Sequence, residues 1–241
     1  MKVNEKVEVD YRSLTVGKIV ARDYRKAMVF KSHGIDFCCG GGISVESAVE
    51  DKDVSLDEII AELEKVDVLE TVEADYESWS TKKLIEHIVY THHNYVTTTI
   101  AQLTPMLAKV EMVHGDWRPE LREVNQLYKE LSAELTIHMK KEEQILFPAI
   151  LTLDEASSMG DNCFGSVQNP ISMMEHEHDI AGELMKKINT LTAGYTLPKG
   201  ACATYTVVYN VLKEFEADLF THIHLENNIL FPRAIQLEGI K

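Results

Sequence analysis

The segment "HMKKEEQILFP", His138–Pro148, returns with few changes as "HIHLENNILFP", His222–Pro232. The shared skeleton is H-x-x-x-E-x-x-I-L-F-P, and its fixed polar residues are one histidine and one glutamate four positions apart. On a helix of about 3.6 residues per turn, positions i and i+4 share a face. Each copy therefore points an imidazole and a carboxylate the same way. The apolar residues that follow, and the proline, are expected to end the helix.

The chain around the two copies is typical of an all-α four-helix bundle. Four long segments with helical apolar spacing follow Ser80, and the connections between them are mostly short. They are 80–110, 119 to the first copy of the repeat, 170 to about 194, and 198 to the second copy. Such an arrangement predicts an up-down-up-down bundle. If the second and fourth helices face each other, two imidazoles and two carboxylates meet inside it.

The first and third segments add histidines of their own. His176 and His178 are two positions apart and so point to different faces of a helix, whereas spacing barely separates His92 from His93. A single H-x-x-x-E is more often a solvated surface pair than a site. Its repetition, together with histidines on all four segments, favours a metal centre inside the bundle.

The residue types also narrow the choice of metal. Four imidazoles and two carboxylates suit first-row transition metals better than calcium or magnesium. Two carboxylates can bridge two ions and leave two imidazoles for each, with coordination positions open to a small exogenous ligand. Iron is the expected metal, and manganese or zinc could use the same ligands.

Residues 1–72 are predicted to form a small helical domain, and residues 73–241 the bundle. Thr15 is expected to cap one helix over 16–33, with Gly34 just beyond its end. Ser55 and Glu58 have the spacing of a capping box. The glycine-rich loop "IDFCCGGG" lies between these helices, and the acidic stretch "VDVLETVEADYESW" is expected to link the domains.

The cysteines do not form the pattern of a disulfide framework. Cys38 and Cys39 are neighbours in the glycine-rich loop, which favours reactive redox thiols if the thiolates are stabilised. The alternative is a tight turn with buried thiols. Two thiolates alone do not complete a four-cysteine cluster site. Cys163 and Cys202 have no partner visible in the sequence and are interpreted as structural.

Composition excludes some functions. The formal net charge is −15, which disfavours binding to nucleic acid. The first residues, "MKVNEKVEVDYRSL", contain no apolar signal region, and no apolar run reaches the roughly 20 residues that cross a bilayer. We therefore expect a cytoplasmic protein with reduced thiols and no membrane contact.

The chain resembles the Repair of Iron Centres (RIC) family, di-iron proteins that repair iron–sulfur clusters damaged by nitric oxide or oxidants. Both copies of the repeat and "PISMMEHEHDIAGEL" are similar to its hemerythrin-like domain, and "HGIDFCCGGG" is similar to the cysteine-containing domain that precedes it. The resemblance spans nearly the whole chain. It implies a hemerythrin-like bundle after a small helical domain, and iron–sulfur proteins as clients. It also allows a homodimer.

The resemblance also implies a ligand set and a bridged metal pair. Glu142 and Glu226 would bridge two irons, with an oxo or hydroxo bridge completing the centre. The implied ligands are His93, His138, Glu142, His178, His222 and Glu226. His92, His176 and His224 are additional histidines that could extend this shell. Glu134, one turn before His138, and Glu177, beside His178, are candidates to orient an imidazole or move protons, or are simply solvated.

Three functions compete for such a centre. The first is repair of damaged clusters, by supplying iron, by reacting with nitric oxide, or both; whether this makes the chain an enzyme stays open. The second is an oxygen or nitric oxide carrier or sensor, in which His92, His176 or His224 would have to supply a fifth histidine. The third is a ferritin-like ferroxidase, which needs E-x-x-H on two helices. Glu175 to His178 provides only one.

Overall fold

The computed structural model describes residues 10–67, 75–155 and 165–239. The chain divides into two compact units, Met1–Trp79 and Ser80–Lys241. The predicted boundary between residues 72 and 73 lies outside the described residues. The all-α class is confirmed, because the described ranges contain helices and turns and only one isolated β-bridge, between Thr15 and Ser44. No helix in these ranges is long and apolar enough to cross a membrane.

The N-terminal unit is built from short helices. They are α1 (Val16–Arg22), the 3₁₀ turn η1 (Tyr24–Lys26), α2 (Ala27–Ser32), α3 (Val45–Val49), α4 (Leu56–Asp67) and the 3₁₀ turn η2 (Tyr76–Ser78). The side chains of Val16, Phe30 and Leu63 are fully buried at its core. Two backbone hydrogen bonds join the glycine-rich loop to α1. The Val16 amide donates to the Ile43 carbonyl, and the Gly17 amide donates to the Gly41 carbonyl.

The capping predictions for this unit are confirmed. The prediction of one continuous helix over residues 16–33 is wrong, because α1, η1 and α2 occupy that range. The Thr15 hydroxyl accepts a hydrogen bond from the Lys18 amide, and Ser55 and Glu58 bond reciprocally. Gly34 has a φ of +63°, as a residue just past a helix end should. Asp23 breaks the predicted helix because its backbone is extended, and its carboxylate instead accepts a bond from the Arg25 amide.

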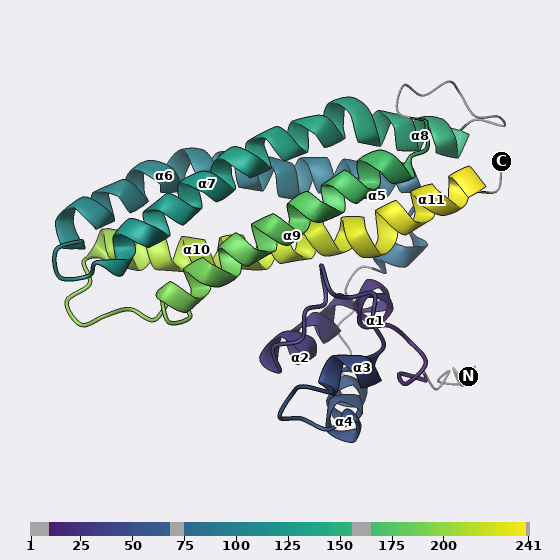
Figure 1. Ribbon diagram of the computed structural model, residues 1–241, viewed down its shortest axis with the longest axis horizontal. Coiled ribbons are helices and arrows are strands. Elements are labelled where there is room, and N and C mark those ends of the chain that lie inside the picture. Colours follow the sequence, from purple (N-terminus) through teal and green to yellow (C-terminus); the bar gives the residue numbers. More distant parts are fainter. Residues whose placement is uncertain (1–9, 68–74, 156–164, 240–241) are drawn as a thin grey trace, which may run out of the picture. The chain divides into compact units, whose positions relative to one another are not determined.

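The second unit is the predicted four-helix bundle, and its long helices run side by side (Figure 1). The first rod is α5 (Thr81–His87), η3 (Ile88–His93) and α6 (Asn94–His114). The second is α7 (Glu120–Lys141), η4 (Glu142–Leu146) and α8 (Phe147–Glu155). The third is α9 (Gln168–Leu191), and the fourth is α10 (Ala203–Leu225), η5 (Glu226–Leu230) and α11 (Phe231–Gly239). Helix α7 packs on α6 and α9, and α10 packs on α6.

Pro148 and Pro232 do not end their helices, contrary to the sequence-based expectation. Each proline is the second residue of a further helix, α8 or α11, which continues the rod. A π-helical turn stands directly before it, η4 in one rod and η5 in the other. A π turn already interrupts the regular α-helical hydrogen bonds, so a residue without an amide proton is tolerated there.

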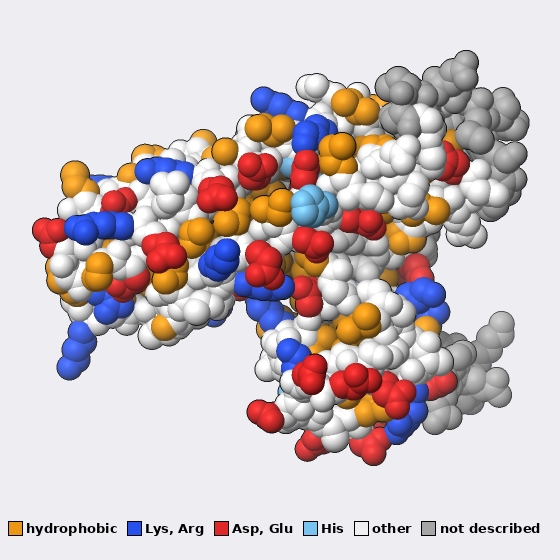
Figure 2. Space-filling view, in the orientation of Figure 1, with side chains coloured by type: hydrophobic (Ala, Val, Ile, Leu, Met, Phe, Trp, Pro, Cys, Tyr) orange, Lys and Arg blue, Asp and Glu red, His pale blue; other side chains and the backbone are white. Residues whose placement is uncertain are grey.

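The bundle interior is apolar along most of its length. Tyr128, Leu212 and Phe215 are among its fully buried side chains, and the ring of Tyr128 meets that of Phe215 edge-on. On the face that Figure 2 shows, basic side chains are scattered among acidic ones over the bundle. A group of polar residues breaks this apolar interior near the π turns.

Candidate metal centre

The four rods converge on six buried polar side chains. All six are the predicted ligands: His93, His138, Glu142, His178, His222 and Glu226. They form two groups, one with His93 and His222 and the other with His138 and His178. Both groups contain Glu142 and Glu226, and the ligand atoms within each group lie within 4.8 Å of one another. Two overlapping four-donor groups with shared carboxylates are the arrangement expected of a bridged metal pair.

The imidazoles meet through their Nε2 atoms. His93 Nε2 is 3.1 Å from His222 Nε2, and His138 Nε2 is 2.9 Å from His178 Nε2. The carboxylate of Glu142 lies 3.3 Å from His138 Nε2, and that of Glu226 lies 3.1 Å from His178 Nε2. Each imidazole therefore presents the same ring nitrogen to the centre.

The π turns explain how the sequence places these groups. Glu142 and Glu226 are the first residues of η4 and η5, and His93 is the last residue of η3. A π turn holds one more residue than an α turn, and such turns occur frequently at functional sites. Three of the four rods thus leave regular α geometry where they carry a ligand.

The outward-facing ring nitrogens of three ligands are fixed by neighbouring side chains. His93 Nδ1 is 2.7 Å from Glu143 Oε1, His138 Nδ1 is 2.8 Å from Glu177 Oε2, and His178 Nδ1 is 2.7 Å from Asn227 Oδ1. An oxygen acceptor at Nδ1 keeps the proton there, so a neutral ring has a free lone pair at Nε2. These contacts select the tautomer that binds a metal.

The histidines of the centre keep the neighbouring carboxylates ionised. Burial by itself raises the pKa of Glu226, but His222 and His178 outweigh it and lower the pKa well below the usual range. Burial lowers the pKa of His138, but the Glu142 carboxylate outweighs it and raises the pKa of His138 to about 9. For His222 burial prevails, and its pKa is lowered. The centre therefore retains negative charge where the two groups overlap.

The donor set fits a bound cation. The four carboxylate oxygens of Glu142 and Glu226 are buried and accept no hydrogen bond within the part of the chain that the structure describes. Leaving buried carboxylate oxygens without hydrogen-bond donors costs considerable free energy. Metal ions held between the facing Nε2 atoms and the shared carboxylates would satisfy them. Imidazole and carboxylate are the donors that iron takes in bundle proteins.

The additional histidines stand outside both groups. His92 is buried against the ring of His222, and its Nδ1 is 2.9 Å from Asp218 Oδ1. His224 is also buried, and its Nδ1 is 3.2 Å from the Asn228 side chain. His176 is exposed on α9. The structure thus places none of these three histidines in either donor group.

The two acidic candidates have different positions. Glu177 contacts the Nδ1 atom of His138 and forms an ion pair with Lys141. Glu134 is exposed on α7, and no hydrogen bond joins it to a ligand imidazole in the described ranges. The structure therefore brings Glu177 to the centre and leaves Glu134 at the surface.

The cysteine loop is organised by Asp36. One oxygen of its carboxylate accepts hydrogen bonds from the amides of Cys38, Cys39 and Gly40, at 2.9–3.1 Å. The two thiol sulfurs are 3.9 Å apart, and the Cys38 side chain is buried. The hydrogen bond with Cys39 and burial hold the pKa of Cys38 well above its usual value. Cys38 is therefore a protonated thiol at neutral pH. Cys163 lies outside the described residues.

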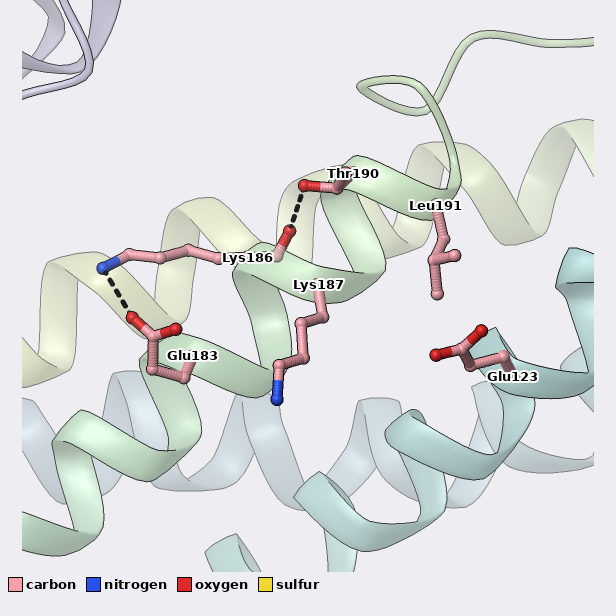
Figure 3. Close-up of a pocket in the computed structure, with 6 residues that line it drawn as sticks. All are labelled: Glu123, Glu183, Lys186, Lys187, Thr190 and Leu191. Carbon is pink, nitrogen blue, oxygen red and sulfur yellow. Dashed lines mark hydrogen bonds and ion pairs between the residues drawn. The ribbon is translucent and has the colours of Figure 1, made fainter.

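A surface groove between α7 and α9 is a separate feature (Figure 3). Its volume is about 450 Å³, and it lies beyond the ligand His178 on α9. Its lining residues are Glu123, Glu183, Lys186, Lys187, Thr190 and Leu191. Lys186 pairs with Glu183 at 3.4 Å, and Thr190 bonds to the backbone of Lys186. This groove contains neither histidine nor cysteine, so it offers no second transition-metal site.

Comparison with known proteins places the chain in a family. Residues 84–234 match the hemerythrin HHE cation binding domain, and residues 12–67 match a domain of unknown function, ScdA_N. The iron–sulfur cluster repair protein YtfE of Escherichia coli O81 (strain ED1a) is 38% identical over 225 residues, covering 93% of this chain and 98% of that protein. The protein of the same name from Escherichia fergusonii is 37% identical over the same shares. The chain belongs to the RIC family.

Sequence reasoning missed three residues that the RIC-family chain uses around its polar sites. Glu143 and Asn227 follow the glutamate in each copy of the repeat, and each contacts the Nδ1 atom of a ligand on another rod. The third is Asp36, two residues before Cys38. A polar residue directly after both repeated glutamates was the available signal. Because the two residues differ, this position does not belong to the identical skeleton of the repeat.

Proposed function

We propose that this chain is a di-iron protein that repairs iron–sulfur clusters damaged by nitrosative or oxidative stress. Two donor groups that share Glu142 and Glu226 carry the proposal, because they suit two adjacent metal ions. The relatives named for iron–sulfur cluster repair support the biological role. Iron bound there would supply a redox-active pair that can bind small molecules such as nitric oxide and can be passed to an apo-protein.

The protein's own residues would hold the metal and control its surroundings. Each group offers two imidazoles and two carboxylates, which leaves positions open on a six-coordinate metal. The acceptors at Nδ1 orient His93, His138 and His178. Phe147 stacks on His93 and Phe231 on His178, with ring centroids 5.8 and 6.0 Å apart. Both phenylalanine rings are buried, so each places an apolar surface beside a proposed ligand.

An oxygen-carrier or sensor role is the weaker alternative. It requires a fifth histidine among the donors. His92, His176 and His224 were the candidates, and each lies outside the two groups. Their positions favour a centre with four histidines, which leaves more coordination positions open than a five-histidine centre would.

Metal content tests the centre itself. Anaerobically purified wild-type protein should contain about two irons per chain, antiferromagnetically coupled in Mössbauer spectra. Glu142→Ala and His222→Ala should lose that coupled signal. His178→Ala should also lose the signal, and His176→Ala is its matched control, because both residues are on α9 and only His178 reaches the centre. Zinc-only protein, or full coupled iron in Glu142→Ala or His222→Ala, would contradict the proposal.

A second experiment tests repair. The iron-loaded protein is incubated with a cluster enzyme damaged by nitric oxide, with free ferrous iron and thiol as the reference. The enzyme's activity should return with the iron-loaded wild type and not with Glu142→Ala. If free iron restores the enzyme and the loaded protein does not, the repair role is wrong even though the metal centre stands.

A further inference from the structure

Cys202 and His114 form a side-chain pair outside the metal centre. His114 is the last residue of α6, and Cys202 is the N-cap of α10. His114 Nε2 lies 3.3 Å from Cys202 Sγ, although the residues are 88 positions apart. Since α10 rises about 1.5 Å per residue, the pair is roughly 30 Å along that helix from His222. It is therefore independent of the metal ligands.

The pair combines an accessible sulfur with an oriented imidazole. Cys202 is exposed, whereas only 6% of His114 is accessible to solvent. The histidine ring contacts the rings of Trp117 and Tyr205, with ring centroids 5.5 and 5.2 Å away. Packing thus aims the Nε2 atom at the thiol and leaves the outer side of the sulfur open to a reagent.

The ends of two long helices favour charge separation within the pair. A helix N-terminus stabilises negative charge and a C-terminus stabilises positive charge. If the thiol proton moves to His114, the thiolate lies at the start of α10 and the imidazolium at the end of α6. Both charges then match the dipole of the helix that carries them. Cysteine beside histidine and at a helix N-terminus is a typical setting for a reactive thiolate.

We propose that Cys202 is a nucleophilic thiol that is modified by exchange with low-molecular-weight disulfides. The Cys202 sulfur attacks one sulfur of the disulfide, the bond between the two small-molecule sulfurs breaks, and a mixed disulfide forms on Cys202. The released thiolate takes the proton that His114 had accepted from Cys202. The products are one mixed disulfide and one small thiol, so atoms and electrons balance without a further oxidant.

Alkylation rates test the activation of the thiol. Wild type, Cys202→Ser, His114→Gln and His33→Gln are treated with iodoacetamide at neutral pH, and each cysteine peptide is followed by mass spectrometry. Loss of the imidazole should slow alkylation of Cys202 by about tenfold, because no neighbouring base then accepts the thiol proton. His33→Gln is the control, because His33 also lies at a helix C-terminus but pairs with Glu62. The alkylation rate of Cys39, measured in the same sample, provides an internal standard.

Unfolding the wild type in urea gives a test that needs no substitution. A thiol activated by the fold reacts more slowly once the chain unfolds, whereas an ordinary exposed thiol keeps its rate. Oxidised glutathione should then add one glutathionyl group at Cys202 faster in the wild type than in His114→Gln, and dithiothreitol should remove it. An unchanged rate in His114→Gln, or no slowing in urea, would overturn the proposal whatever the outcome for the metal centre.

Discussion

The two copies of the repeat build the same contacts around different histidines. In the first copy, Glu143 contacts the Nδ1 atom of His93 and Phe147 stacks on its ring. In the second, Asn227 and Phe231 do the same for His178. Each copy therefore supplies its own histidine and glutamate and also fixes the histidine of another rod. The phenylalanine of each repeat therefore belongs to the site together with its histidine and glutamate.

The two donor groups nevertheless differ in the hydrogen bonds that hold their histidine rings. In the group of His138 and His178, both Nδ1 atoms have an acceptor. In the group of His93 and His222, the Nδ1 atom of His222 is buried and makes no hydrogen bond with the described residues. Acceptors at Nδ1 fix the ring and raise ligand basicity. The comparison teaches that a near-symmetric repeat can produce one donor group in which both imidazoles have Nδ1 acceptors and one in which only a single imidazole does.

The largest expected effect separates shared from unshared ligands. Glu226→Ala removes a donor from both groups, whereas His93→Ala removes a donor from one. We expect Glu226→Ala to bind no iron and His93→Ala to keep about half of the wild-type iron. Colorimetric iron analysis of the purified variants measures this. Equal losses in the two variants would show that the groups do not bind independently.

The pKa contrast between His138 and His222 predicts how the metal-free protein responds to pH. The pKa of His138 is raised from 6.5 to about 9 in the folded protein. The stability this gives is fully present below pH 6.5 and is lost as pH rises through 9. It amounts to at most about 3 kcal/mol. The free energy of unfolding in urea, measured at pH 6.5 and at pH 9, should fall from the first pH to the second for the wild type. It should not show this fall for His138→Gln. His222→Gln should keep it, because the folded pKa of His222 is lowered.

Removal of an outer acceptor should weaken iron binding by a smaller amount. Glu177→Ala deprives His138 of its Nδ1 partner, and such changes cost about 10–100-fold in metal affinity. Glu143→Ala should cost less, because 42% of the Glu143 side chain is exposed, against 21% for Glu177. Competition with a ferrous chelator measures both. Glu134→Ala is the control on α7 and should bind like the wild type.

The smallest effects are expected at the stacked phenylalanines. Phe147→Leu and Phe231→Leu each leave a small cavity beside a ligand ring and should lower the free energy of unfolding by about 1–2 kcal/mol. Because both rings are buried and stacked alike, the two losses should be similar. Thermal unfolding of the metal-free variants compares them. A loss in only one variant would show that the two copies do not pack equivalently.

The helical apolar spacing of four long segments made the bundle predictable, and the repeat made part of its centre predictable. Residue spacing fixes that His138 and Glu142 share a face, and it does the same for His222 and Glu226. The choice of His93 over His92 came from the family resemblance, because local periodicity hardly distinguishes neighbouring residues. The structure separates them, since His93 belongs to a donor group and His92 pairs with Asp218.

Contacts between rods could not be predicted in the same way. Glu143 and His93 are 50 positions apart, and their contact depends on how α7 and η4 pack against the first rod. His114 and Cys202 meet for the same kind of reason, across the ends of two helices. The break at Asp23 shows the converse, because a side-chain bond to the local backbone overrode a continuous helical apolar pattern.

The π turns make the centre sensitive to chain length. Removing one residue from Glu226–Leu230 would allow ordinary α-helical bonding to continue through the repeat. It would also change the helical phase, turning Phe231 and all of α11 by about 100° relative to His222. Phe231 would then face away from His178. Substitutions in this segment alter one contact at a time, whereas a one-residue deletion would separate the proposed metal ligands from the aromatic residues that stack on them.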